Sequence, residues 1–180
     1  MEPVRQARET LFAGRRIHVV RDVYLTTAGQ TYVRELVLTR GAVVMLPLFP
    51  DEQICLIRNY RDAVGQELWE LPAGTLEPGE MPDQAAAREL EEEIGYRARS
   101  WRKLLEFYPS PGILSECMHL YVAWDMEKTV QRLDEGERIT PEIVPFAEAL
   151  RWIENGRIRD GKTIVGLLYW EWHRTQTEDS

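Results

Sequence analysis

The segment "GTLEPGEMPDQAAARELEEEIGY", residues 74–96, decides the fold because it describes one helix with two different faces. Pro82 suits a first helical turn, since its missing N–H would be unpaired there, and Gly95 suits the C-terminal stop. At about 100° per residue, apolar side chains that include Leu90 and Ile94 share one face. We therefore expect a helix over 82–94 that packs on a sheet.

The opposite face of this helix carries Glu89, Glu92 and Glu93, which are neighbours at three- and four-residue spacing. Uncompensated, they destabilise the helix by mutual repulsion and by their place near the negative end of its dipole. One interpretation is a solvated charged face. The other is a bound divalent cation, which the additional Glu80 in the preceding loop and the framing glycines and prolines favour. Mg²⁺ prefers oxygen ligands and bridges carboxylates to substrate phosphates.

Composition bounds the remaining possibilities. The chain has 180 residues, 44% of them apolar, which suits one globular domain with a small appendage. Thirty acidic and 22 basic residues give a net charge of -8, which disfavours nucleic acid and anionic membranes as partners. No apolar run approaches the length of about 20 residues that a membrane helix needs. Cys55 and Cys117 each lie in an apolar run, which favours a reducing compartment, and we expect a cytoplasmic protein.

The runs around the helix predict a sheet. Residues 15–26 and 31–40 form a β-rich pair around a glycine turn, and residues 41–49 and 53–61 are more continuously apolar. Further strands are expected over 66–74, 100–112 and 117–126 and at the end of 131–145, with helices over 146–158 and 160–174. We expect an α/β fold, with residues 1–40 as a small N-terminal antiparallel β-unit and residues 41–180 as the main domain.

The segment around the helix resembles the signature of the Nudix hydrolases. The matching positions are Gly74, Glu80, Arg88, Glu89, Leu90, Glu92, Glu93 and Gly95; Tyr96 replaces the usual aliphatic residue. The resemblance implies an α/β/α sandwich with a mixed β-sheet. It also implies hydrolysis of a nucleoside diphosphate linked to another moiety, with Mg²⁺ or Mn²⁺ as the cofactor.

The same resemblance assigns roles around the metal. It implies that Glu89, Glu92 and Glu93, with the backbone carbonyl of Ala73, bind the ions. Glu80 and Arg88 orient those ligands.

Sequence outside the signature is similar to the branch of ADP-ribose pyrophosphatases and nucleoside-diphosphate-sugar hydrolases. The likeness lies in "IRNYRDAVG", "ELWELPAG" and "YPSPG", which includes Pro111. It implies that Arg61, and Arg58 on the same run, contact the substrate, with the diphosphate assigned to Arg61. Glu70 would lie in the site, and Glu116 would contact the terminal ribose. An ordinary surface arginine and a solvated loop acid are the alternatives for Arg61 and Glu116.

The general base and the nucleobase contacts stay open. The acidic run "LDEGER" stands where this branch often carries its base, which makes Glu135 and Glu137 catalytic candidates. The alternatives are Glu92 or Glu93 as the base, and a merely solvated turn. Three aromatic residues could stack on the base, although each suits core packing as well: Tyr24, Tyr32 and Trp69.

The leading functional hypothesis is hydrolysis of ADP-ribose to AMP and ribose 5-phosphate. One alternative changes the substrate to another nucleoside diphosphate sugar, such as ADP-glucose or GDP-mannose. A second is a non-catalytic sensor on the same fold. The resemblance also implies a homodimer whose N-terminal strands complete the substrate site of the other subunit.

Overall fold

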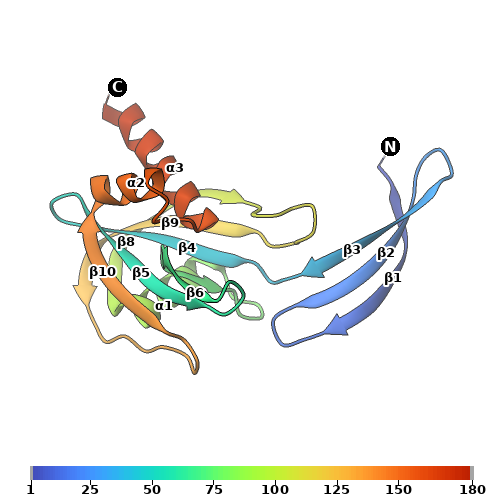
Figure 1. Ribbon diagram of the computed structural model, residues 1–180, viewed down its shortest axis with the longest axis horizontal. Helices are drawn as coiled ribbons and strands as arrows, with labels where there is room; N and C mark the ends of the chain where they lie inside the picture. The colour runs from blue at the N-terminus through green and yellow to red at the C-terminus, as the bar shows by residue number, and fades with distance from the viewer. Residues whose placement is uncertain (1, 179–180) are drawn as a thin grey trace. The chain divides into compact units, whose positions relative to one another are not determined.

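The computed structural model describes residues 2–178 of the chain, and the side chains of residues 2–176. The chain divides into two compact units (Figure 1). The N-terminal unit contains the residues up to Gly41 together with Phe107–Met118, and the second unit contains Ala42–Glu106 and the residues from His119 on. Each unit is described by itself below.

The N-terminal unit is built on a three-stranded antiparallel sheet in the order β1-β2-β3. Its strands are β1 (Val4–Ala13), β2 (His18–Leu25) and β3 (Thr31–Leu38). Strand β1 is not indicated by the sequence pattern, because its apolar residues do not alternate and all ten of its residues are exposed. Its pairing with β2 explains its extended conformation.

One buried acid organises this small sheet. Asp22 accepts hydrogen bonds of 2.7 Å each from Nε and Nη2 of Arg8, and one of 3.2 Å from the hydroxyl of Tyr24. The bonds from Arg8 hold the pKa of Asp22 below its ordinary value. The carboxylate thereby ties β1 to β2 where few apolar side chains are available to do so.

The second unit contains a seven-stranded sheet, with a main path in the order β10-β5-β4-β9-β8. Strand β6 pairs with β5, and β7 pairs with β4, both antiparallel. The strands are β4 (Ala42–Phe49), β5 (Gln53–Arg61), β6 (Gln66–Glu70), β7 (Ala73–Thr75), β8 (Tyr96–Phe107), β9 (Met118–Lys128) and β10 (Ile139–Pro145).

Two strand boundaries differ from the sequence expectation. The single strand expected over 66–74 is two strands, interrupted at Leu71 and Pro72, because proline has no N–H to donate to a ladder. The chain therefore changes partner, from β5 to β4, just before the glutamate helix. Strand β8 begins at Tyr96, directly after the helix, and not at residue 100.

Helix α1 (Pro82–Ile94) covers one face of the sheet. Its buried Leu90 and Ile94 pack with side chains of β4 and β5 such as Met45 and Ile57. The helix ends where expected, since Gly95 has φ 68°, a left-handed conformation that glycine adopts without strain.

Helices α2 (Phe146–Glu154) and α3 (Gly161–Glu178) complete the unit on the other side of the sheet (Figure 1). Gly166 of α3 shows how closely they pack, because a Cβ atom there would lie 2.5 Å from Leu71 and 3.3 Å from Leu120. The predicted α/β/α sandwich with a mixed sheet is confirmed. Among the described residues, no helix is long and apolar enough to cross a membrane.

Candidate active site

A buried carboxylate joins helix α1 to the start of strand β7. The ladder between β4 and β7 pairs Val44 with Ala73, which brings the Ala73–Gly74 backbone next to the helix. Oε2 of Glu93 accepts a hydrogen bond of 2.8 Å from the N–H of Ala73, and Glu93 is only 3% exposed. Burial raises the pKa of Glu93 well above its ordinary value, and the nearby charge of Glu89 raises it further. A positive charge nearby would therefore stabilise the ionised form of Glu93.

Gly74 leaves space for a second carboxylate. A Cβ atom at this position would lie 1.8 Å from Cδ of Glu89, so the Glu89 carboxyl group occupies the volume that any other residue would fill. Burial raises the pKa of Glu89 to about 6, and the charge and hydrogen bond of Arg88 oppose the rise. The fixed glycine of the motif therefore has a steric reason.

Arg88 offsets part of the repulsion on this helix face. Its Nε and Nη2 donate to the two oxygens of Glu80 at 2.8 and 2.9 Å, and its Nη1 donates to Glu89 at 2.8 Å and Glu92 at 3.0 Å. The hydrogen bonds to Arg88 lower the pKa of Glu80. One guanidinium thus bonds three carboxylates at once.

These groups fit a hard divalent cation. Glu89, Glu92 and Glu93 offer only oxygen donors, as Mg²⁺ and Mn²⁺ prefer, and two of the carboxylates are largely buried with raised pKa values. A cation would satisfy charge that Arg88 leaves uncompensated, because Arg88 bonds three acids and the buried Glu93 carboxylate lies instead against the N–H of Ala73.

A second ionic cluster lies beside the first. Arg61 at the end of β5 donates from Nε and Nη2 to Glu70 at 2.8 and 2.5 Å, and the Glu70 side chain is fully buried. The hydrogen bonds with Glu70 raise the pKa of Arg61, and the charges of Glu93 and Asp160 raise it further. The sequence candidates Arg61, Glu70 and Glu93 are therefore close enough to interact.

Comparison with known proteins decides the family. The sequence pattern of the NUDIX domain matches residues 38–165, which is more than half of the chain. The chain belongs to the Nudix family. The resemblance found in the sequence is confirmed, and the pyrophosphatases among its relatives make it a Nudix pyrophosphohydrolase.

The chain is similar to several known proteins over most of its length. It is 37% identical to the methanol dehydrogenase activator of Bacillus methanolicus, covering 89% of this chain and 88% of that protein. It is 36% identical to the ADP-ribose pyrophosphatase of Bacillus subtilis (strain 168), covering 91% and 89%. A crystal structure of an ADP compounds hydrolase matches with a TM-score of 0.85 and 26% identity, over 98% of this chain and 96% of that chain.

Within this Nudix domain, Glu135 and Glu137 lie in different surroundings. Both belong to the loop between β9 and β10. Glu137 accepts a hydrogen bond of 3.0 Å from the N–H of Asp134, and its charge helps to raise the pKa of Glu89 and Glu93. Glu135 is exposed at the turn. The structure therefore brings Glu137 within electrostatic reach of the carboxylates on α1.

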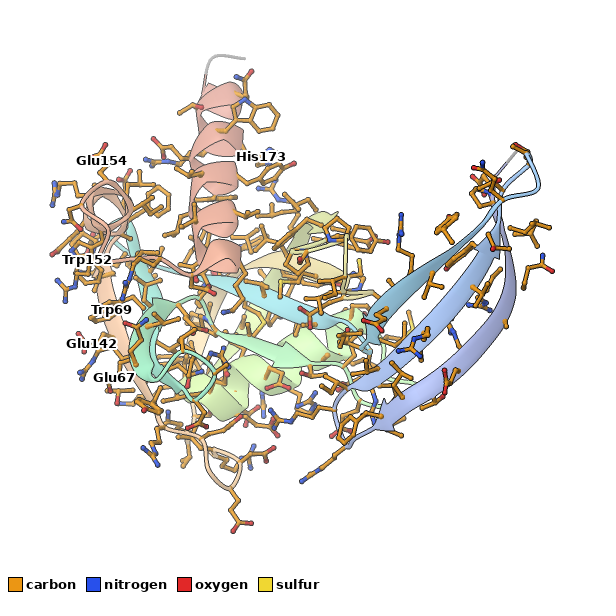
Figure 2. All side chains as sticks on the ribbon, turned by 45° about the vertical axis from the view of Figure 1, so that its right-hand side comes forward. Glu67, Trp69, Glu142, Trp152, Glu154 and His173 are labelled. Carbon is orange, nitrogen blue, oxygen red and sulfur yellow. The ribbon has the colours of Figure 1, made fainter. Side chains whose placement is uncertain are left out.

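Arg58 lies apart from the Nudix carboxylates. Its strand neighbour Ile57 packs against α1, so Arg58 points from the opposite face of β5. It donates to Glu142 at 2.8 Å and lies 5.9 Å from the ring of Trp69. Figure 2 shows Glu142, Trp69 and Glu67 close together along this face, below Trp152. Trp69 packs on Trp152 with ring centroids 4.7 Å apart.

Three further candidates belong to the N-terminal unit. Tyr24 and Tyr32 stack on each other with ring centroids 5.3 Å apart and planes inclined by 13°. Arg34 lies 4.6 Å from the ring of Tyr32. Glu116 lies in the segment Phe107–Met118 of the same unit.

Lys162 and Asp160 were not identified from the sequence. Nζ of Lys162 donates to Glu70 at 2.5 Å and lies 3.0 Å from Asp160. The signal available was the run "DGKT" before an apolar periodic segment, which predicts a helix N-cap but not an ionic partner ninety-two residues away.

Replacing Gly74 by alanine tests the cation cradle. We expect Gly74→Ala to fold normally, because the flexible end of Glu89 can move away from the new methyl group. The displaced carboxylate should weaken Mn²⁺ binding by about 10–100-fold, measured by isothermal titration calorimetry. Gly112→Ala is the matched control, since a Cβ atom there meets nothing within 4 Å. Unchanged Mn²⁺ affinity in Gly74→Ala would contradict the assignment.

Proposed function

We propose that the protein hydrolyses the diphosphate bond of ADP-ribose and releases AMP and ribose 5-phosphate. The observation that carries the proposal is a pair of carboxylates, the buried Glu93 and the largely buried Glu89, packed against Ala73–Gly74 with the guanidinium of Arg61 nearby. The ADP-ribose pyrophosphatase of Bacillus subtilis supports the choice of substrate, because it resembles this chain over nine-tenths of its length.

The proposed cofactor is Mg²⁺ or Mn²⁺. Glu89, Glu92 and Glu93 would hold it together with the carbonyl oxygen of Ala73, while Arg88 and Glu80 keep those carboxylates in place. When bound, the cation supplies positive charge to the diphosphate and makes water more acidic.

The protein groups then have distinct tasks. Arg61 uses Nε and Nη2 on Glu70, so its remaining N–H groups can donate to a diphosphate oxygen. The contacts of Arg58 with Glu142 and Trp69 favour Arg61 over Arg58 for this task. Glu116 remains the candidate for the terminal ribose.

The chemical step is a displacement at one phosphorus atom. The oxygen of water forms a new P–O bond, the bond from that phosphorus to the bridging oxygen breaks, and the second phosphate leaves with the electron pair. Glu137 is the proposed acceptor of the proton from water, because it already lies within electrostatic reach of Glu89 and Glu93.

We also propose that the protein acts as a cytoplasmic homodimer in which the N-terminal unit binds the nucleobase. Apolar residues on its sheet, among them Val4, Phe12 and Val33, are about half exposed or more. Such a patch suits burial against a second copy. The two cysteines, Cys55 and Cys117, each lie in an apolar run, which fits a reducing compartment. Sedimentation equilibrium tests the dimer, and a mass of 21.0 kDa at micromolar concentration would refute it.

The substrate is tested by incubating the protein with ADP-ribose, ADP-glucose, GDP-mannose and NAD, with and without Mg²⁺, and separating the products. We expect AMP, released fastest from ADP-ribose and only with the metal. Glu93→Gln should lower kcat by on the order of 10³-fold or more, because it removes charge that binds the cation.

The matched control for that variant is Glu154→Gln, at an exposed position on α2 (Figure 2). It should have the wild-type rate. Faster turnover of another substrate would change the sugar or base and keep the mechanism. Tight binding of one compound without turnover would indicate a sensor.

The general base is tested by comparing Glu137→Gln with Glu135→Gln. We expect Glu137→Gln to lower kcat by about 10²–10⁴-fold and to remove the acidic limb of the pH–rate profile. Glu135→Gln should stay within about twofold of the wild type, since the exposed side chain is not expected to take the proton. A reversed result would assign the base to Glu135. Little effect in either variant would return the role to Glu92 or Glu93.

A further inference from the structure

A nearly buried lysine, Lys162, belongs to the second ionic cluster, that of Arg61 and Glu70. The carboxylate of Glu70 is fully buried and accepts hydrogen bonds from both Arg61 and Lys162. Lys162 is itself 9% exposed. Burying an ammonium group is costly, so its place requires compensation, which Glu70 and Asp160 provide at 2.5 and 3.0 Å.

The first turn of helix α3 fixes Lys162 in this place. Asp160 caps the helix, since its carboxylate accepts hydrogen bonds from the N–H and hydroxyl of Thr163 at 3.0 and 2.6 Å. The hydroxyl oxygen of Thr163 accepts a bond of 2.7 Å from the N–H of Leu71. The start of helix α3, which carries Lys162, is therefore tied to the residue that follows Glu70.

Arg61 is the exposed member of this cluster. Its side chain is 41% exposed, whereas that of Glu70 is fully buried and that of Lys162 is 8% exposed. Within residues 2–176, Nη1 of Arg61 has no hydrogen-bond partner, so this nitrogen is available to a ligand. Glu70 is the most buried member of the cluster, Lys162 is nearly as buried, and Arg61 is open to solvent.

The contacts among Lys162, Glu70 and Arg61 matter because the acids on α1 attract the Arg61 guanidinium. Arg61 lies near enough to Glu93 for their charges to interact, so an unrestrained guanidinium would be drawn toward the carboxylates that a cation needs. The two hydrogen bonds to Glu70 hold it away from them. Glu70 can do this only while its own carboxylate is fixed, and Lys162 fixes it.

We propose that Lys162 is a positioning residue for diphosphate hydrolysis, acting through Glu70 to aim the guanidinium of Arg61 at the substrate diphosphate. The inference rests on the proposed function in that it takes Arg61 as a diphosphate contact. Lys162 contacts Glu70 and Asp160, so in this proposal it acts on the diphosphate through Arg61.

A double-mutant cycle separates this role from a structural one. We expect Lys162→Met to lower kcat/KM for ADP-ribose by about 10–100-fold with Mn²⁺ affinity unchanged. In an Arg61→Ala background, Lys162→Met should change kcat/KM by less than about twofold, because the group on which it acts is gone. Lys162→Arg should recover part of the activity. Lys128→Met is the matched control, at an exposed position on β9.

The same cycle measured by ligand binding does not depend on turnover. The probe is α,β-methylene-ADP, whose bridging carbon resists hydrolysis, and dissociation constants are measured by calorimetry with Mn²⁺ present. Non-additive losses in this cycle support the role of Lys162 even if the wild type hydrolyses none of the tested substrates, which would refute only the proposed activity.

Several results would overturn the role. They are equal losses from Lys162→Met with and without Arg61, a loss of Mn²⁺ affinity in Lys162→Met, and a wild type that does not bind α,β-methylene-ADP. If Lys162→Met does not fold, Lys162→Arg and Lys162→Gln replace it in the same cycle.

Discussion

The hydrogen bond from the N–H of Ala73 to the buried carboxylate of Glu93 is the contact on which the arrangement of the site depends. It joins helix α1 to the three-residue strand β7, which the ladder with β4 and a bond from Arg88 to the carbonyl of Thr75 also hold. The bond places a backbone carbonyl, a glycine and the acidic face of α1 next to one another. Nearly every feature of the glutamate motif follows from keeping that junction closed and charged.

Two cationic supports then stabilise opposite sides of the junction. Arg88 connects Glu80, Glu89 and Glu92 on the surface of α1, with the charged groups partly open to solvent. Lys162 extends from helix α3 to the buried Glu70, and Arg61 bonds the same Glu70 carboxylate. The first support sets the positions of oxygen atoms for a cation, and the second sets the position of a guanidinium for an anion. The acidic and basic halves of the site are thus anchored to different helices.

The sequence predicted what depends on neighbouring residues. The bounds of α1, its two faces and the stop at Gly95 follow from spacing and backbone preference, and the structure agrees. Glu80 and Arg88 are only eight residues apart, so a short sequence motif contains both. The contact of Lys162 with Glu70 joins two elements far apart in the chain, so no local pattern contains it. The sequence pattern did not predict strand β1 for a related reason: its extended conformation depends on pairing with β2. The sequence left Glu135 and Glu137 equivalent, and loop geometry separates them.

The raised pKa values on α1 link the cation to the lifetime of the folded chain. Folding raises the pKa of Glu89 from 4.5 to about 6, so without metal its ionised form opposes folding above pH 6, by at most about 2 kcal/mol, and this opposition vanishes below pH 4.5. Glu93 acts in the same direction. A bound cation replaces the proton and removes the cost at neutral pH. The supply of a divalent cation would then govern how often the chain opens to proteases as well as how fast it turns over substrate.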